Sequence, residues 1–302
     1  MMVRAVSALT NRRGIGDARQ LLREFRFVQQ LFDFRQIARQ RNRTSAAVTG
    51  EAGFLHRTVE AGLIDRLNDI QRPFTRIALL GVLDQALATR LAQLYPDCLV
   101  VQLDCAKARL RHSRPAILFD LNNLPLRPAS FDLVLINMLA HWVEDLPGLL
   151  VQIRKALQPD GLMLSACFAQ GSLDQLAHAL LGAESRLYGG GSLRCIPLPS
   201  MRQLTDLLVR AGFVIPVGDV QSIEVRWQSF TGMLRELRLM GEGNASQARV
   251  RHLTGGRLFQ LAEALMQAEA GGDGCIKADV QIAWLHGWAP TAVVASDGAT
   301  SV

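Results

Sequence analysis

Cysteine is scarce in this sequence, and long apolar runs are missing from it. The five cysteines are odd in number, are scattered and form no CxxC pair: Cys98, Cys105, Cys167, Cys195 and Cys275. This pattern argues against a disulfide framework and a structural zinc site, and it favours a reducing compartment. No apolar run approaches the length of about 20 residues that a membrane-spanning helix needs, so no transmembrane segment is expected.

Several catalytic motifs are missing as well. The chain has no GxSxG nucleophile elbow and no phosphate-binding P-loop, so a serine hydrolase is not supported. Four of its histidines have no metal-ligand spacing such as HExxH, and no metal site is predicted: His112, His178, His252 and His286. The net charge of +6 favours acidic partners only in a general way.

The N-terminal region is rich in arginine and poor in acids. Residues 1–45 hold ten arginines against Asp17, Glu24 and Asp33, a composition typical of an organelle transit peptide. We favour instead an N-terminal extension that runs into an amphipathic helix, because the arginines continue past the usual length of a targeting segment. The apolar stripe of that helix is formed by Leu21, Leu22, Phe25, Val28, Leu31 and Phe32. A nucleic-acid-binding arm is the weakest interpretation, because aromatic residues are not interleaved for base stacking, and no nucleic-acid partner is expected.

The clearest structural pattern spans residues 131–168. An apolar run of strand length is followed by helical apolar spacing over 144–157, by a turn at 158–161 and by a second apolar run over 162–168. This order predicts a βαβ unit, which forms a right-handed parallel crossover. Strands that are apolar on both faces are typical of a sheet covered by helices on both sides.

Similar patterns extend in both directions along the chain. Before residue 131 we expect strands at 76–80, 99–103 and 116–119 and helices at 54–67 and 85–94. After residue 168 we expect helices at 173–181, 201–210, 229–239 and 258–267, and strands at 213–217, 222–227 and 280–288. Pro216 makes the strand at 213–217 an edge strand or an irregular one. The alternation predicts an open α/β sheet.

In such a sheet, ligands bind beyond the carboxyl ends of the strands. The residues at these ends are Gly81, Asp104, Asp120 and Asn137. An acidic residue after the second strand can accept hydrogen bonds from two ribose hydroxyls, which makes Asp104 a candidate nucleotide ligand. A strand-end or helix-capping aspartate explains Asp104 equally well, and Asp120 suits a turn.

Six segments carry a resemblance to a known family. They are FDFRQIARQRNR, FLHRTVEAGLIDRLNDIQRPF, LPLRPASFDLVLINMLAHWVEDLPGLLVQIRKALQPDGLML, LVRAGF, LRLMGEGNA and VQIAWLHGW, and they cover nearly everything from residue 31 to residue 288. In these segments the chain resembles the class I S-adenosylmethionine-dependent methyltransferases. It is most similar to a branch that holds the complex I assembly factor of the arginine-hydroxylase type and the malonyl-carrier-protein methyltransferase of biotin synthesis. The HWVEDLP and LMGEGNA segments point to the assembly-factor side.

The resemblance implies a fold, a cofactor and a domain plan. It implies a Rossmann-like, mostly parallel seven-stranded sheet with helices on both faces and an antiparallel last strand. Residues 1–30 would form the basic extension and 290–302 a disordered tail. Between them, 31–289 would form one methyltransferase-like domain, with N-terminal helices at 31–74, a cofactor-binding half at 75–168 and a substrate-side half at 169–289. The predicted cofactor is S-adenosylmethionine, with contacts from Gly81, Asp104, Cys105, Asp120, Leu121 and Asn137.

One motif departs from the family pattern. The loop after the first strand should read acidic-x-Gly-x-Gly-x-Gly, but here only Gly81 is kept, Leu79 replaces the acid, and Leu83 and Gln85 replace glycines. The glycines let the backbone approach the cofactor closely, so these side chains are expected to obstruct it. Unmet buried polar groups cost about 1–3 kcal/mol each, which would weaken cofactor binding.

Two functions therefore remain open at the level of the sequence. The first is an S-adenosylmethionine-dependent enzyme, either a methyltransferase or a hydroxylase variant, that acts on a protein or carrier-protein substrate and has a link to complex I assembly. The second is a non-catalytic assembly factor on the same scaffold. His141 is the one candidate base, although packing at the start of the next helix explains it as well. Glu242 and Asn244 are expected near the substrate mouth, although ordinary turn chemistry explains them as well. We expect a cytoplasmic protein, with the mitochondrial matrix as the alternative.

Overall fold

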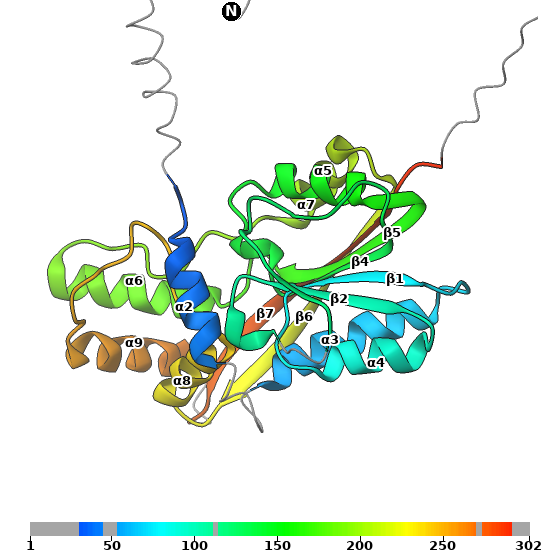
Figure 1. The fold of residues 1–302 in the computed structure, drawn as a ribbon. Coiled ribbons are helices and arrows are strands. Elements are labelled where there is room, and N and C mark those ends of the chain that lie inside the picture. The colour runs from blue at the N-terminus through cyan, green and yellow to red at the C-terminus, as the bar shows by residue number, and fades with distance from the viewer. Residues whose placement is uncertain (1–29, 45–52, 111–113, 270–273, 292–302) are drawn as a thin grey trace, which may run out of the picture. The chain divides into compact units, whose positions relative to one another are not determined.

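The computed structural model describes residues 30–44, 53–110, 114–269 and 274–291 (Figure 1). The chain divides into two compact units, Met1–Leu31 and Phe32–Val302, and all elements below belong to the second. Most of the predicted basic extension, with its helical stripe from Leu21 to Val28, and most of the predicted tail lie outside the described residues.

A single seven-stranded sheet forms the centre of the second unit. Its order is β3-β2-β1-β4-β5-β7-β6, in which β1 to β5 pair in parallel and β7 pairs antiparallel with both of its neighbours. The strands are β1 (Arg76–Leu80), β2 (Leu99–Asp104), β3 (Ala116–Leu118), β4 (Phe131–Asn137), β5 (Leu157–Phe168), β6 (Val214–Trp227) and β7 (Ile276–Trp288). The predicted mostly parallel sheet with an antiparallel last strand is confirmed.

Helices cover both faces of this sheet. They are α2 (Phe34–Thr44), α3 (Phe54–Asn68), α4 (Ala86–Leu94), α5 (Leu146–Ala156), α6 (Asp174–Tyr188), α7 (Met201–Ala211), α8 (Phe230–Met240) and α9 (Gly256–Glu269). Two short 3-10 helices, η3 (Lys107–Arg109) and η4 (Ala140–Trp142), follow β2 and β4. In the described part of the chain, no helix is both long enough and apolar enough to cross a membrane.

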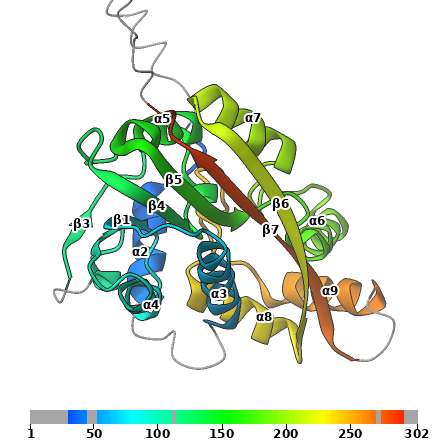
Figure 2. The same cartoon turned by 90° about the vertical axis from the view of Figure 1, so that its right-hand side faces the viewer.

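The strands divide the core into two layers because side chains alternate across a sheet. In β1, Ile77 and Leu79 pack on the side of α3 and α4, whereas Ala78 and Leu80 pack on the side of α5 and α7. The two pairs of helices lie on opposite faces of the sheet (Figures 1 and 2). Helices α6, α8 and α9 extend the first layer beyond the strands, and α2 adds Ile37 to the second.

The sixth strand differs from its prediction. The two expected segments at 213–217 and 222–227 form one continuous strand, β6, which pairs with β7 along most of its length. Residues 218–221 connect the two segments, but their side chains are exposed, so they carry no apolar alternation that would reveal a strand. The register shifts between Val214 and Val217, around Pro216, and β6 lies at the sheet edge, as the proline predicted.

Candidate functional site

Three of the predicted cofactor residues meet at the carboxyl edge of the sheet. Gly81, Asp104 and Asn137 end or follow the neighbouring strands β1, β2 and β4. Gly81 has a φ of +85°, and a Cβ there would lie 2.1 Å from the carbonyl oxygen of Asn137. Only glycine meets both conditions, so this glycine allows the end of β1 to pack directly against the end of β4.

The other three predicted residues have local roles. Asp120 is exposed and accepts a hydrogen bond from the Asn122 amide at 3.0 Å within its own turn. Leu121 is buried in the core layer of α5 and α7. Cys105 follows Asp104 and is half-buried, and burial raises the pKa of its thiol to about 12, so it stays protonated at neutral pH.

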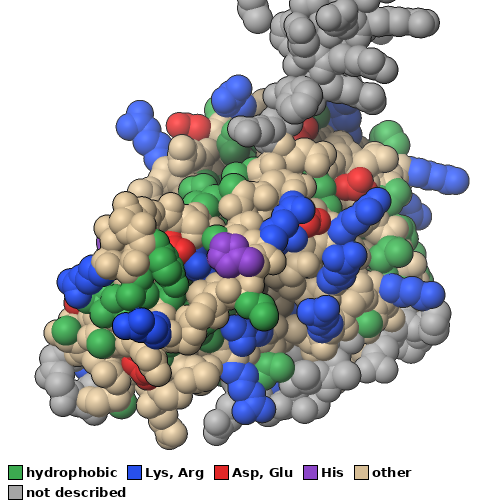
Figure 3. All heavy atoms as spheres, turned by 90° about the vertical axis from the view of Figure 1, so that its left-hand side faces the viewer, with side chains coloured by type: hydrophobic (Ala, Val, Ile, Leu, Met, Phe, Trp, Pro, Cys, Tyr) green, Lys and Arg blue, Asp and Glu red, His purple; other side chains and the backbone are tan. Residues whose placement is uncertain are grey.

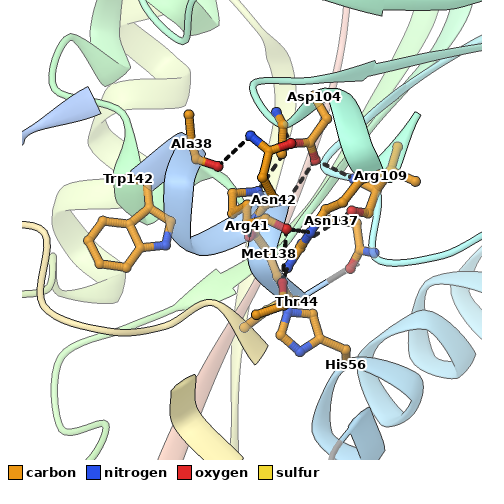
Figure 4. A network of polar contacts seen from close by, with 12 residues as sticks. Ala38, Arg41, Asn42, Thr44, His56, Asp104, Arg109, Asn137, Met138 and Trp142 are labelled. Carbon is orange, nitrogen blue, oxygen red and sulfur yellow. Dashed lines mark hydrogen bonds and ion pairs between the residues drawn. The ribbon is translucent and has the colours of Figure 1, made fainter. Parts of the chain in front are cut away.

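Asp104 forms a buried ion pair with Arg41 of α2 (Figure 4). Its Oδ2 accepts from Arg41 Nη2 at 2.7 Å and its Oδ1 accepts from Arg41 Nε at 3.2 Å. The backbone amides of Val82 and Ala106 each donate to the same carboxylate at 2.8 Å. Burial acts to raise the pKa of Asp104, but the charge and hydrogen bonds of Arg41 outweigh it, so the pKa is lowered and the carboxylate is ionised.

A second arginine, Arg109, holds the surroundings of this pair together. It donates to the backbone carbonyls of Arg41, Val82 and Met240 at 3.0 to 3.2 Å and to the Thr44 hydroxyl at 2.7 Å. Burial, with the nearby charge of Arg41, lowers the pKa of Arg109 to about 10, which still leaves it charged at neutral pH. The end of α2, the loop after β1 and the end of α8 are therefore joined by one side chain.

Asn137 connects the same edge to α3. Its Nδ2 donates to Glu60 Oε1 at 3.2 Å, whereas its buried Oδ1 has no hydrogen-bond partner among the described residues. Burial raises the pKa of Glu60 to about 7, with a further contribution from Asp84. A protonated Glu60 can donate to a neighbouring acceptor, so Glu60 changes from acceptor to donor as its carboxyl is protonated near neutral pH.

A buried cluster of aromatic and titratable side chains surrounds Glu242, in the turn after α8. Glu242 Oε2 accepts from Trp142 Nε1 at 2.9 Å and lies 2.9 Å from Nε2 of His141. Burial acts to raise the pKa of Glu242, but the charge and hydrogen bond of His141 lower it to about 2. Burial also lowers the pKa of His56 to about 3, which keeps that imidazole neutral.

Several polar atoms of this cluster are buried without a partner. In the region that the structure describes, these atoms are Glu242 Oε1, His141 Nδ1 and both ring nitrogens of His56. Glu242 Oε1 and His56 Nε2 are 3.8 Å apart, too far for a hydrogen bond. Buried polar groups are nearly always satisfied by protein or by ordered water, so these atoms mark a place where a water molecule or a polar ligand group binds.

A cavity of about 290 Å³ opens beside the Glu242 cluster. Its walls are mostly apolar side chains, among them Leu176 of α6, Leu234 of α8, Phe259 of α9 and Phe168 at the end of β5. His141, Trp142 and Glu242 line it together with Asn244. Lys and Arg side chains are spread widely over the molecular face on which α2, α6 and α9 lie (Figure 3).

Three arginines also line the cavity, but two of them are already paired. Arg194 lies 2.6 Å from Glu184, and Arg249 lies 2.7 Å from Asp33. Within the described chain, Glu242 is the single carboxylate that lines this cavity, and no group of three or more residues could hold a metal ion. The cavity therefore combines mostly apolar walls with one carboxylate, Glu242, and with the third arginine, Arg238.

The predicted cofactor does not fit Asp104 as this site is arranged. A ribose needs the carboxylate to accept its hydroxyl protons, but the Asp104 side chain has no exposed surface and both oxygens are already used. Leu83 is buried beside the loop, whereas Gln85 pairs with the Gln102 amide at 2.8 Å. The side chain that occupies the position beside Asp104, where the ribose was predicted, is Arg41 of α2 and not a side chain of the loop after β1.

The sequence analysis did not identify Arg41 as a site residue, although the sequence contains one pattern that indicates a buried partner for it. Ile37, Arg41 and Thr44 are the buried residues of α2, at helical spacing on one face. A charged residue on such an apolar face needs a buried partner. Spacing alone cannot show that the partner is Asp104, 63 residues away.

Comparison with known proteins gives relatives over most of the chain. A methyltransferase-domain family model matches residues 80–165. The mitochondrial arginine-hydroxylase NDUFAF5 of Mus musculus is 32% identical over 241 residues, which are 78% of this chain and 70% of that protein. The zebrafish (Danio rerio) protein of the same name is 28% identical, over 86% of this chain and 83% of its own length. A malonyl-[acyl-carrier protein] O-methyltransferase of Xylella fastidiosa is 29% identical, over 86% of this chain and 90% of its own length.

Solved structures show the same fold at lower identity. A Bacillus halodurans protein described as a methyltransferase has a TM-score of 0.54 and 12% identity, and the match covers 78% of this chain and all of that one. The YcgJ protein of Bacillus subtilis has a TM-score of 0.50 and 13% identity, over 76% of this chain and 98% of that one.

Proposed function

Because this chain belongs to the class I S-adenosylmethionine-dependent methyltransferase family, we propose that it is an enzyme that modifies a protein or carrier-protein substrate. S-adenosylmethionine is the cofactor of this family. The sequence resemblance to the assembly-factor branch extends the proposal to a substrate linked to respiratory complex I. Two substrate classes have to be separated, a nitrogen-bearing side chain and the carboxylate of a carrier-bound acyl group.

The ionised carboxylate of Glu242 at the inner end of the cavity is the observation that carries the proposal. It lies behind apolar walls, and its Oε1 has no donor among the described residues. An acyl carboxylate placed there would be repelled by a like charge in a region of low dielectric. A guanidinium, amine or amide supplies the missing donor, so we infer that the substrate group is an N–H donor on a protein.

His141 is suited to hold the proton of such a group. The hydrogen bond between its Nε2 and Glu242 Oε2 fixes the orientation of the ring. In the neutral ring with the proton on Nε2, Nδ1 is an acceptor, and it has no hydrogen-bond partner among the described residues. A carboxylate that orients a histidine in this way is a common arrangement for general-base chemistry.

The test compares cells that lack the gene with cells that carry wild-type protein or Glu242→Gln. Mass spectrometry of respiratory-complex subunits should show an added mass on a nitrogen-bearing side chain with the wild-type protein. We expect Glu242→Gln to reduce that modification at least about 30-fold, because removing one partner of a buried charged contact costs about 2–5 kcal/mol. Transfer of a labelled methyl group to a malonyl-carrier protein instead would refute the choice of substrate.

One observation favours a second candidate, a non-catalytic assembly factor on the same scaffold. The occupied Asp104 carboxylate leaves the ribose position closed in this arrangement. In that case the gene would still be needed for assembly, but subunit masses would be identical with and without it. The same mass spectrometry experiment therefore separates the two candidates.

A further inference from the structure

The Asp104 carboxylate is saturated by contacts within the chain. It accepts four hydrogen bonds, from Arg41 Nε and Nη2 and from the amides of Val82 and Ala106. Two carboxylate oxygens offer about four acceptor positions in total. Two of the four are taken by a side chain, and these are the two that a conformational change can free.

Each nitrogen of the Arg41 guanidinium also has a partner in this position. The third nitrogen, Nη1, lies 3.4 Å from the Met138 carbonyl oxygen, and the side chain is 1% exposed. The fork of a guanidinium against a carboxylate matches the geometry of two ribose hydroxyls that donate to one acid. Without a ligand, moving Arg41 away would leave the buried Asp104 carboxylate without its counter-charge, so the arrangement with Arg41 in place is the stable one when no ligand is bound.

We propose that Arg41 is an internal competitor for the ribose position, so that the cofactor binds only when the Arg41 side chain leaves Asp104. This inference rests on the proposed function, because it assigns the regulation of the same cofactor site. The required movement is a rotation of one side chain. The Arg41 backbone stays in place, since its carbonyl accepts a hydrogen bond from Arg109 at 3.0 Å.

This competition has a quantitative consequence for affinity. When the binding-competent state is only a fraction of the population, the apparent Kd rises by the inverse of that fraction. Minor states are commonly populated at about 0.1–10%. Removing the competitor should therefore strengthen cofactor binding by about tenfold or more.

The experiment is calorimetric titration of the full chain with S-adenosylhomocysteine. We expect Arg41→Gln to bind at least about tenfold more tightly than wild type, because glutamine is too short to form the same fork with Asp104. The matched control is Arg39→Gln, the same substitution on an exposed position of the same helix, which should bind as wild type does. Adding Asp104→Asn to Arg41→Gln should abolish the gain, because the ribose then loses its ionised acceptor.

Stability is measured in parallel, because removing Arg41 leaves Asp104 buried without its counter-charge. Even if Arg41→Gln lowers Tm, S-adenosylhomocysteine should raise its Tm more than it raises that of wild type. Equal affinity in wild type and Arg41→Gln, or no binding by either, would overturn the proposal. Tight binding by Arg41→Gln with no modified substrate in cells would support the competition and refute only the proposed enzymatic function.

Discussion

His141 and Glu242 are 101 residues apart in the chain, yet their Nε2 and Oε2 atoms lie 2.9 Å from each other. The contact joins η4, after the central strand β4, to the turn that ends α8. Trp142 Nε1 donates to the same carboxylate oxygen, which fixes the rotamer of Glu242 from two sides. The inner end of the cavity is therefore ordered before a substrate arrives, which lowers the entropy that binding must overcome.

The first prediction concerns acid stability. The folded pKa of Glu242 is about 2 against an ordinary value of 4.5, so its ionised form stabilises the fold above pH 4.5. That stabilisation is lost as pH falls from 4.5 through 2, and it amounts to about 3 kcal/mol. In Glu242→Gln, the free energy of unfolding should fall less steeply as the pH is lowered. Denaturant titration between pH 2 and pH 6 measures this dependence. An unchanged dependence would show that Glu242 is not held by its neighbours.

The second prediction is that Glu60 gives the free energy of unfolding the opposite dependence on pH. Its folded pKa is raised to about 7 from 4.5, so its contribution is fully favourable below pH 4.5 and is lost as pH rises through 7. The loss amounts to about 3 kcal/mol, and Glu60→Gln should remove it while keeping an acceptor for Asn137. The variant should therefore be more stable than wild type at pH 8 and similar to it at pH 4.5. Greater stability of wild type at pH 8 would contradict the prediction.

The close packing of the ends of β1 and β4 can be tested by substituting Gly81, with Gly190 as the control position. Gly81→Ala should lower the free energy of unfolding by about 2–4 kcal/mol, because it combines an unfavourable φ with a backbone clash. Gly190→Ala is the control, since a Cβ there meets no atom within 4 Å. Chemical denaturation of both variants gives the comparison. Equal stability would mean that the ends of β1 and β4 can separate without penalty.

The cavity can be tested by filling it. Leu234 lines it from α8, and Leu234→Trp should block the substrate and abolish modification of the protein while leaving Tm close to wild type. The control is Leu181→Trp on α6, at a side chain that is 52% exposed and outside the cavity lining. Both variants are compared by the mass spectrometry assay. Full modification by Leu234→Trp would place the substrate elsewhere.

The sheet was predictable because its strands are short, apolar runs separated by helical spacing. β1 and β4 are buried along nearly their whole length, and their boundaries follow from composition alone. β6 was predicted as two pieces because its middle is exposed on both faces and is held by backbone pairing to β7. Backbone pairing leaves no trace in a pattern of side chains.

The position of the candidate residues was predictable where it follows from topology. Gly81, Asp104 and Asn137 lie at one edge of the sheet because parallel strands bring their ends together, and their role in cofactor binding stays a prediction. We expected Leu83 and Gln85 to obstruct the approach of the cofactor, but it is Arg41 that takes the position beside Asp104. Which side chain pairs with Asp104 depends on where α2 packs against η3 and α8. That packing is a tertiary property that a single sequence does not encode locally.

The four hydrogen bonds of Arg109 have a consequence for motion. They reach the last turn of α2, the residue after Gly81 and the end of α8 through one guanidinium. None of these segments can separate from the others without breaking charge-assisted contacts in a buried place. The amide hydrogens along this edge should therefore exchange with solvent as one cooperative unit, with a common free energy of opening.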